Sequence, residues 1–276
     1  MSGAIEKSLA ILEAIALHPG GMQVSAIAAR LDQPVSGVHR QLREFERLGY
    51  VRQIRDQGEY ALTIKLAAIG LSFLSRAGVN DVAQPILDRL ARQTGELIRL
   101  SVLDGDDLVW VAVAQGATGG LRYDPGSEQG VVVHLASTAG GQAYLATLSD
   151  EEALMRVGRQ DVLRRDVAPA ARAPRTGLQV LEMLRETRRR GFSLAIDTYL
   201  DGMAAMAVPV FSRGSGKVLG CVSVAGPSVR LRPERLSETA AALRAAADDL
   251  GAAADASQYF AELRPRMEAA HAEPAE

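Results

Sequence analysis

The chain has 276 residues, a formal net charge of −2 at pH 7 and hydrophobic residues at 47% of its positions. This length predicts two domains, and the composition is typical of a globular protein. The near-neutral charge excludes a basic field over the whole chain, so any binding to nucleic acid has to come from charges placed locally. The single cysteine, Cys221, excludes an intramolecular disulfide framework and fits a reducing compartment.

The sequence contains no metal-binding or membrane-spanning pattern. It has no CxxC or HExxH motif, and its four histidines are scattered. No apolar run reaches the ~18 residues that a membrane helix needs, and the N-terminus lacks a signal-peptide pattern. We therefore expect a cytoplasmic protein without a metal site, a cofactor or a membrane anchor.

The N-terminal residues are predicted to form three helices and a hairpin. The first helix spans about residues 4–18 and ends at a Pro-Gly-Gly sequence. An apolar helix around Ile27 is followed by a break at Asp32-Gln33-Pro34 and by a second helix from about Val35 to Leu48. This is the spacing of a helix-turn-helix, whose second helix enters a major groove of DNA. Alternating residues on both sides of Asp56-Gln57-Gly58 predict a hairpin, which makes the unit a winged helix-turn-helix.

The predicted second helix has an apolar side and a polar side. Val38, Leu42, Phe45 and Leu48 recur at helical spacing and are expected to be buried. The candidate DNA-binding residues, on the other side and on the hairpin, are Pro34, Val35, Ser36, His39, Arg40, Arg43, Arg52 and Arg55. Such helix pairs also occur in all-α proteins that never touch nucleic acid. The hairpin directly after the second helix is the feature that favours DNA binding.

Residues 63–76 (TIKLAAIGLSFLSR) are strongly apolar, and only Lys65 and Arg76 are charged. A helix that is apolar on more than one side is normally buried against something. Because the preceding small domain already has a filled core, we interpret this segment as a linker helix at a dimer interface. The alternative is that the helix packs across its own second domain.

The remaining chain is predicted to form an α+β domain with an antiparallel sheet, because strands, helices and further strands follow one another with hairpin connections. Residues 159–176 are predicted to be a loop, with a short helix within it as the alternative. The expected division of the chain is 1–62, 63–79, 80–258 and a tail at 259–276. The predicted strands are 96–104, 107–115, 121–123, 131–134, 192–196, 203–211 and 217–225, and the predicted helices are 81–93, 137–148, one opening at 149–152, 177–190 and 233–250.

Small residues gather on segments that this domain is expected to bring together. Residues 137–141 place small side chains and backbone N–H groups at a helix start, which suits a carboxylate. The space for a small molecule is expected to come from small residues on two neighbouring strands, namely Ala204, Ala205 and Ala207 after Gly202, and Gly220, Cys221 and Ser223. The alternative is that the small residues only permit close packing. Trp110 and Tyr123 either line the cavity or fill the core.

Five segments, taken in order, resemble the IclR family of bacterial transcriptional regulators. They are SLAILEAIA, VSAIAARLDQPVSGVHRQLREFERLGYV, HLASTAGGQAYLATLSDEE, RRRGFSLAIDTYLDGMAAMAVPV and GKVLGCVSVAGPSVRL, and the resemblance covers about residues 4–251. It implies an N-terminal winged helix, a linker helix and a C-terminal effector-binding domain related to the GAF fold. It also implies dimers, often paired into tetramers, on palindromic operators in double-stranded DNA. The implied effectors are small organic acids or aromatic catabolites.

The resemblance also implies which residues contact the effector. They are Thr138, Ala139, Gly140, Met203, Ala205, Cys221 and Ser223. The chain departs from the family pattern at three places. Leu62-Thr63 replaces the usual Leu-Gly before the linker helix, Gly141-Gln142-Ala143 lacks the usual lysine, and Asp197-Thr198 replaces an acidic pair. These departures leave the effector class open.

Three functions are compatible with the sequence, and the first is expected. It is a ligand-responsive DNA-binding regulator that controls a small-molecule catabolic operon. The second is a ligand sensor that acts through protein contacts. The third is a small hydrolase that uses Ser137, Cys221 or His134. No GxSxG motif surrounds a serine to support it, so we name no catalytic residue.

Overall fold

The computed structural model describes residues 3–55, 59–76, 79–123, 128–163 and 170–254. The chain divides into two compact units, Met1–Ser75 and Arg76–Glu276, and each has its own hydrophobic core. The finer division at residues 62, 79 and 258 stays a prediction. The predicted tail at 259–276 and the predicted hairpin turn at 56–58 lie outside the described residues.

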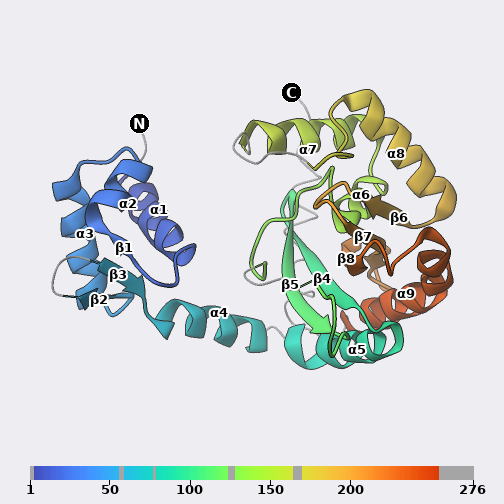
Figure 1. Ribbon diagram of the computed structural model, residues 1–276, viewed down its shortest axis with the longest axis horizontal. Helices are drawn as coiled ribbons and strands as arrows, with labels where there is room; N and C mark the ends of the chain where they lie inside the picture. The colour runs from blue at the N-terminus through green and yellow to red at the C-terminus, as the bar shows by residue number, and fades with distance from the viewer. Residues whose placement is uncertain (1–2, 56–58, 77–78, 124–127, 164–169, 255–276) are drawn as a thin grey trace. The chain divides into compact units, whose positions relative to one another are not determined.

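The first unit is a winged helix-turn-helix, as predicted (Figure 1). Its elements in chain order are α1 (Ala4–Ala16), β1 (Met22–Gln23), α2 (Val24–Arg30), α3 (Val35–Arg47), β2 (Val51–Arg55), β3 (Glu59–Leu62) and α4 (Ile64–Arg76). The strands form an antiparallel sheet in the order β1-β3-β2.

Strand β1 was not predicted, because two residues are too few for a periodic signal. Gly21 before it has φ +91°, and an added Cβ would lie 3.1 Å from the Tyr60 carbonyl oxygen.

The core of the first unit lies beneath α3. Val38 and Leu42 are fully buried and Phe45 is half-buried, as expected from their spacing. The expectation for Leu48 is wrong, because this side chain is 41% exposed. Helix α3 ends at Arg47 and Gly49 takes a left-handed conformation (φ +79°), so Leu48 lies where the chain turns away from the core.

Helix α4 carries exposed apolar side chains in the single chain. Leu66 packs against the core of the first unit. Further along the helix, Ile69, Leu71 and Phe73 are each more than half exposed. Within the chain alone, this surface therefore remains in contact with water.

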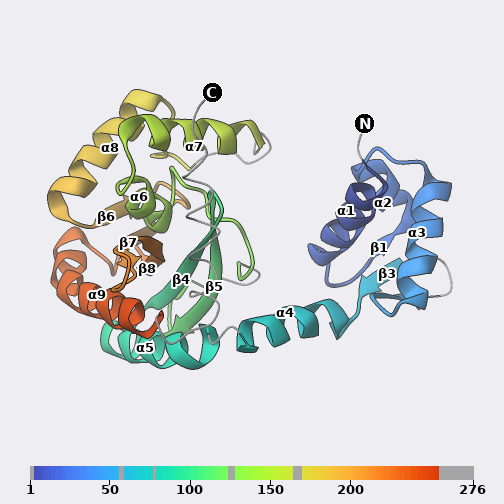
Figure 2. The ribbon, with the colours of Figure 1, turned by 180° about the vertical axis from the view of Figure 1, so that it is seen from behind.

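The second unit is built on an antiparallel sheet with helices on both faces (Figures 1 and 2). Its elements in chain order are α5 (Val79–Thr94), β4 (Leu97–Asp104), β5 (Asp107–Gln115), α6 (Ala139–Leu145), α7 (Asp150–Leu163), α8 (Gly177–Arg190), β6 (Ser193–Ile196), β7 (Met203–Phe211), β8 (Val218–Pro227) and α9 (Pro233–Ala254). The strand order β5-β4-β8-β7-β6 has every neighbouring pair antiparallel. The predicted α+β class is confirmed, and the relation to the GAF fold stays a prediction.

Four local predictions in this unit differ from the structure. Residues 121–123 form no strand, and within 131–134 only Val132 makes an isolated bridge, to Val109. This segment follows β5 through single hydrogen bonds, such as Val133 N–H to the Leu108 carbonyl (2.7 Å), without a regular ladder. Helix α7 extends to Leu163, into the predicted loop, while helix α6 ends at Leu145, before the expected Leu148.

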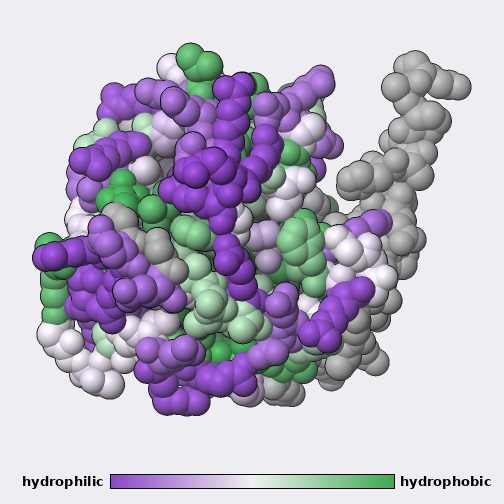
Figure 3. Space-filling model, turned by 90° about the vertical axis from the view of Figure 1, so that its right-hand side faces the viewer, coloured by the Kyte–Doolittle hydropathy of each residue, from purple (hydrophilic) through white to green (hydrophobic). Residues whose placement is uncertain are grey.

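The two faces of the sheet have different neighbours. Helices α5 and α9 cover one face, and their apolar side chains form a core with alternate strand residues such as Leu100 and Val222. Helices α6, α7 and α8 contribute to the core on the other face, which includes Trp110 and Cys221. The outer surface over α8 and α9 is largely hydrophilic, with apolar residues scattered over it (Figure 3).

Candidate nucleic-acid interface and ligand pocket

The polar side of α3 faces solvent. The predicted residues Pro34, Val35, Ser36, His39, Arg40 and Arg43 are all exposed. Pro34 occupies the N-cap position, and its carbonyl accepts the N–H groups of Gly37 and Val38. The rigid core beneath α3 therefore presents these side chains together on one exposed helix face.

The charges on α3 are not equally available. Arg43 lies 3.3 Å from the Glu46 carboxylate, and Arg47 pairs with Glu44. The hydrogen bond from Arg47 holds the pKa of the Glu44 carboxyl below its usual value. Arg40 has no carboxylate partner among the described residues. Arg40 is thus the side chain on this helix whose charge no neighbour offsets, whereas exposed pairs such as Arg43–Glu46 are weak and can open.

The wing adds a second set of contacts beside the helix. Arg52 is exposed on β2 and pairs in register with Ala61 on β3. Arg55 lies at the end of β2, opposite Glu59, and its side chain lies outside the described residues. The structure therefore places the Arg52 side chain on the surface and leaves Arg55 as a prediction.

The end of α3 is bonded to the start of α4. Thr63 Oγ1 donates to the Gly49 carbonyl at 2.6 Å, and the Thr63 N–H donates to the Tyr50 carbonyl at 2.9 Å. Lys65 Nζ donates to the Leu48 carbonyl at 2.7 Å and lies 4.6 Å from the centre of the Tyr50 ring. These bonds satisfy the carbonyl of Leu48, the C-cap residue of α3, and two carbonyls of the turn that follows it. Helix α4 is therefore attached directly to the exposed helix.

The second unit has a pocket on the α6 face of its sheet. Along this face, the register aligns Leu97 of β4, Ala225 of β8 and Ala205 of β7 in one row. The adjacent row contains Arg99 of β4 and Ser223 of β8. The alanine and serine side chains are too short to fill the space beneath α6, which creates a hollow. The pocket is lined by Arg99, Trp110, Tyr123, Thr138, Ala139, Gly140, Ala195, Thr198, Tyr199, Leu200, Met203, Ala204, Ala205, Ser223 and Ala225.

The pocket is narrow. Its cavity volume is about 30 Å³, which corresponds to roughly two water molecules at the ~10–15 Å³ that each needs. The Trp110 and Tyr199 rings form one wall, in an edge-to-face arrangement with 6.0 Å between ring centroids. A ligand larger than a short organic acid therefore requires side chains to move.

The pocket contains a buried cation that the sequence did not reveal as a site residue. Arg99 is only 6% exposed. Its guanidinium lies 4.8 Å from the centre of the Trp110 ring and 4.9 Å from that of Tyr123. Its Nη2 atom is 2.8 Å from Glu128 Oε2. The signal was a single charged residue inside the otherwise apolar or small run Leu97–Leu103, on the same strand face as Ser101.

Tyr123 connects to the same ion pair. Its hydroxyl donates a hydrogen bond to Glu128 Oε1. Burial, together with this bond, raises the pKa of Tyr123 well above its usual value, so the hydroxyl remains a donor. We call the four residues Arg99, Trp110, Tyr123 and Glu128 the Arg99 cluster.

Most of the predicted effector residues lie together in this pocket. Thr138, Ala139, Gly140, Met203, Ala205 and Ser223 line it. Cys221 is fully buried in the core behind it and is not among the lining residues. Thr138 caps α6, because its Oγ1 accepts the Gly141 N–H at 3.1 Å, so one of the N–H groups expected to be available for a carboxylate is already occupied.

The residues considered for a hydrolase lie in environments that suit packing. Burial raises the pKa of the Cys221 thiol, which keeps it protonated and weakly nucleophilic. His134 Nδ1 is 2.6 Å from Ser137 Oγ, and the same nitrogen accepts the Ser137 N–H at 3.3 Å. Ser137 is 94% buried. This short-range pair therefore stabilises the turn before α6.

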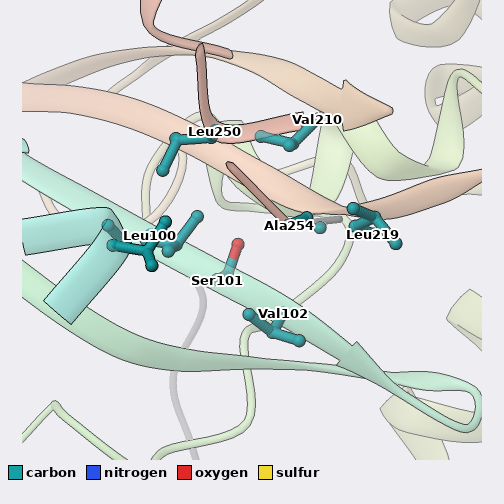
Figure 4. A pocket seen from close by; sticks show the side chains of 10 residues that line it. Leu100, Ser101, Val102, Val210, Leu219, Leu250 and Ala254 are labelled. Carbon is teal, nitrogen blue, oxygen red and sulfur yellow. The ribbon is translucent and has the colours of Figure 1, made fainter. Parts of the chain in front are cut away.

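A second hollow lies between the other face of the sheet and the ends of α5 and α9 (Figure 4). Its volume is about 20 Å³, and apolar side chains such as Leu100, Val210 and Leu250 surround it. Among the described residues that line it, Ser101 alone has a polar side chain, and its hydroxyl already donates to the Cys221 carbonyl at 3.2 Å. This hollow therefore offers no polar group that would orient a ligand.

The described part of the chain has neither a metal-binding cluster nor a membrane-spanning helix. No group of three or more His, Cys, Asp or Glu residues is placed to hold a metal ion there. No described helix combines the length and apolar character that crossing a bilayer requires.

Both units match family models. Residues 4–55 match the IclR helix-turn-helix domain, and residues 71–252 match the C-terminal domain of the bacterial transcriptional regulator IclR. The transcriptional repressor IclR of Escherichia coli (strain K12) is 27% identical over 247 residues, which cover 90% of this chain and 88% of that protein. The HTH-type transcriptional regulator BhcR of Paracoccus denitrificans is 29% identical over 248 residues, 90% of this chain and 85% of that protein.

The fold is also found in solved structures. An IclR homologue from Microbacterium hydrocarbonoxydans, crystallised in complex with 4-hydroxybenzoate, superposes with a TM-score of 0.70. The two sequences are 21% identical, and the match covers 91% of this chain and 98% of that one. At this identity, the similarity shows a shared fold.

Proposed function

Since the chain belongs to the IclR family of bacterial transcriptional regulators, which are ligand-responsive DNA-binding proteins, we propose how its two units divide that work. The exposed side of α3 reads operator DNA, and the pocket beneath α6 binds a small organic or aromatic acid that changes the affinity for the operator. The observation that carries this proposal is the pairing of an exposed basic helix face with a separate pocket that contains a buried cation. Such a regulator works in the cytoplasm, where it meets DNA.

In the DNA complex, α3 lies in the major groove. Arg40 and Arg43 contact phosphates or guanine, and Ser36 and His39 contact base edges or phosphates. Arg52, and Arg55 at the end of β2, contact the backbone beside the groove. Pro34 and Val35 lie at the start of α3, where the helix approaches DNA first.

Two copies of the chain are required for a palindromic operator. Two α3 helices then enter successive major grooves, about 34 Å apart. The exposed apolar residues Ile69, Leu71 and Phe73 of α4 support a dimer contact through this helix, because such a surface is costly to leave in water. Dimers of this kind can pair further into tetramers.

Coupling between the units runs through α4. The bonds of Thr63 and Lys65 to the Gly49 and Leu48 carbonyls attach this helix to the end of α3. A change in the direction of α4 therefore moves α3 with it. An effector shifts the equilibrium only by the difference between its affinities for the two arrangements.

A small acid is the effector class that the pocket favours. Arg99 provides positive charge, and Trp110 and Tyr199 provide an aromatic wall. The complex of the Microbacterium hydrocarbonoxydans homologue with 4-hydroxybenzoate supports a small-molecule ligand for a protein of this fold. We propose that the domain binds without catalysis, because the Cys221 thiol is buried and protonated and Ser137 is engaged in a turn.

The experiment is a gel shift with the DNA upstream of the protein's own gene. The wild-type chain is titrated at two salt concentrations, and a panel of small organic and aromatic acids is then tested for release or tightening of the complex. We expect salt-sensitive binding to a palindromic site and a response to at least one acid. Absence of any specific DNA complex, with the chain folded, would contradict the regulator and favour a sensor that acts through protein contacts.

A further inference from the structure

We propose that Arg99 is the counter-ion for the carboxylate of the effector, and that Glu128 occupies Arg99 until this carboxylate displaces it. The inference rests on the proposed function, because it assigns the ligand chemistry of the same pocket. It also explains why this chain lacks a lysine after Gly141 and yet keeps a cation at the pocket, since Arg99 supplies the charge from β4.

The positive charge of Arg99 is buried. A guanidinium remains protonated in proteins, so Arg99 carries its charge although it is 94% buried. A buried charge is costly unless it is paired and hydrogen-bonded. The guanidinium lies less than 5 Å from the centres of the Trp110 and Tyr123 rings, and Glu128 provides the opposite charge. The chain thus retains a positive group at a place where packing alone would favour an apolar one.

The Arg99–Glu128 ion pair is incompletely hydrogen-bonded. Arg99 Nε and Glu128 Oε2 are buried and have no aligned hydrogen-bond partner among the described residues, although Nη2 and Oε2 are 2.8 Å apart. The same unit contains an arginine pair with a complete fork. Arg230 donates from Nε to one oxygen of buried Glu96 and from Nη2 to the other, at 2.7 Å. Arg99 therefore has donor capacity left for another carboxylate, whereas Arg230 uses its fork within the fold.

The positive and negative charges of the Arg99 cluster balance each other. The cluster contains one guanidinium and one carboxylate, so a second anion that entered beside Glu128 would face a like charge in a buried space. An anion that replaces Glu128 leaves the charge balance unchanged and gains the same donors, namely Arg99 and the Tyr123 hydroxyl. Departure of Glu128 also frees the space beside Arg99 and Tyr123, which both line a cavity of only about 30 Å³. An anionic effector is therefore expected to exchange with Glu128, and a neutral one is not.

The test uses the full chain and matched pairs of acids and amides, propionate with propionamide and benzoate with benzamide, titrated by calorimetry. The wild-type protein is expected to bind at least one acid and to bind its amide much more weakly. Arg99→Gln is expected to weaken binding of that acid by about 30-fold or more, the effect of removing one partner of a buried charge pair. Glu128→Gln is expected to strengthen it by about tenfold, because the competing internal carboxylate is gone.

Two further variants keep the test decisive. In R99Q/E128Q both charges are removed together, so the double variant is expected to fold and to bind acid and amide alike. Arg156→Gln is the matched control, because Arg156 is also mostly buried, pairs with Asp106 at 2.9 Å and lies over the Tyr144 ring, but is not among the residues that line this pocket. The Arg156→Gln variant is expected to bind the acid with an affinity within about twofold of the wild-type protein.

Three results would overturn the inference: acid affinity unchanged in R99Q, acid affinity lowered in E128Q, or a wild-type protein that binds none of the acids or binds acid and amide equally. Gel shifts with the operator are run on the same proteins. Operator binding that persists while the acid titrations fail would overturn this inference alone. Acid binding that behaves as expected in a protein without operator binding would overturn only the proposed function.

Discussion

Arg40 in the first unit and Arg99 in the second are charged side chains in opposite environments. Arg40 lies exposed on α3 without a carboxylate partner among the described residues. Arg99 is buried against the Trp110 and Tyr123 rings and beside Glu128. Water solvates the first charge at no cost to folding, so it remains available to a phosphate. The second charge depends on its neighbours for stability, so a ligand can bind it only by taking the place of one of them.

The largest expected effect concerns stability and separates the two arginines. Arg99→Gln leaves the Glu128 carboxylate buried without its partner, which is expected to lower the free energy of unfolding by about 3 kcal/mol. The R99Q/E128Q double variant is expected to recover most of this loss. Arg40→Ala on the surface of the first unit is expected to cost less than about 0.5 kcal/mol. Urea unfolding of the second unit is followed by the fluorescence of Trp110, the only tryptophan in the sequence, and that of the first unit by far-ultraviolet circular dichroism. Equal losses of unfolding free energy in R99Q and R40A would contradict the contrast.

The second effect concerns DNA binding. Arg40→Ala is expected to weaken operator binding by about tenfold and to reduce the salt slope by about one, because one phosphate or base contact is lost. Arg43→Ala is expected to have a smaller effect, since Glu46 already offsets part of its charge. Gel-shift titrations at several salt concentrations measure both. An unchanged affinity and salt slope in R40A would remove Arg40 from the interface.

The third effect concerns the pocket. Ser223→Leu adds apolar volume beside Arg99, in a cavity that has little room. It is expected to weaken effector binding by about tenfold or more, as overpacked sites usually resist ligands and rearrangement. Operator binding without effector is expected to stay within about twofold of wild type. Normal effector-dependent release by this variant would place the binding site elsewhere.

The smallest effect concerns the connection between the exposed helix and the linker. Thr63→Val removes the hydroxyl donor to the Gly49 carbonyl, which is expected to cost about 1 kcal/mol of stability. Operator binding is expected to persist, while the effector changes the operator affinity less than in wild type. Thermal melting and gel shifts with and without effector measure these quantities. A full effector response in T63V would show that Thr63 contributes nothing to coupling.

The first unit could be predicted almost completely from local signals. The periodicity of Val38 and Leu42 and the polar residues between them identified α3 and its exposed side. Strand β1 and the exposure of Leu48 were missed, because two residues carry no period and because the end of a helix depends on where the chain turns.

In the second unit, the strands β4, β5, β7 and β8 were recognised by their apolar runs. The segment at 131–134 was misread, since an apolar run does not reveal whether a ladder forms.

The sequence by itself determined the order of the helices and strands, the basic side of α3 and the small residues that leave space beneath α6, because these depend on spacing along the chain. Only the tertiary structure decided that Glu128 pairs with Arg99 at the pocket wall and that Thr63 and Lys65 hold the end of α3. The physical reason is that pairing between distant residues depends on strand register and on the path of loops. Local periodicity carries no information about either.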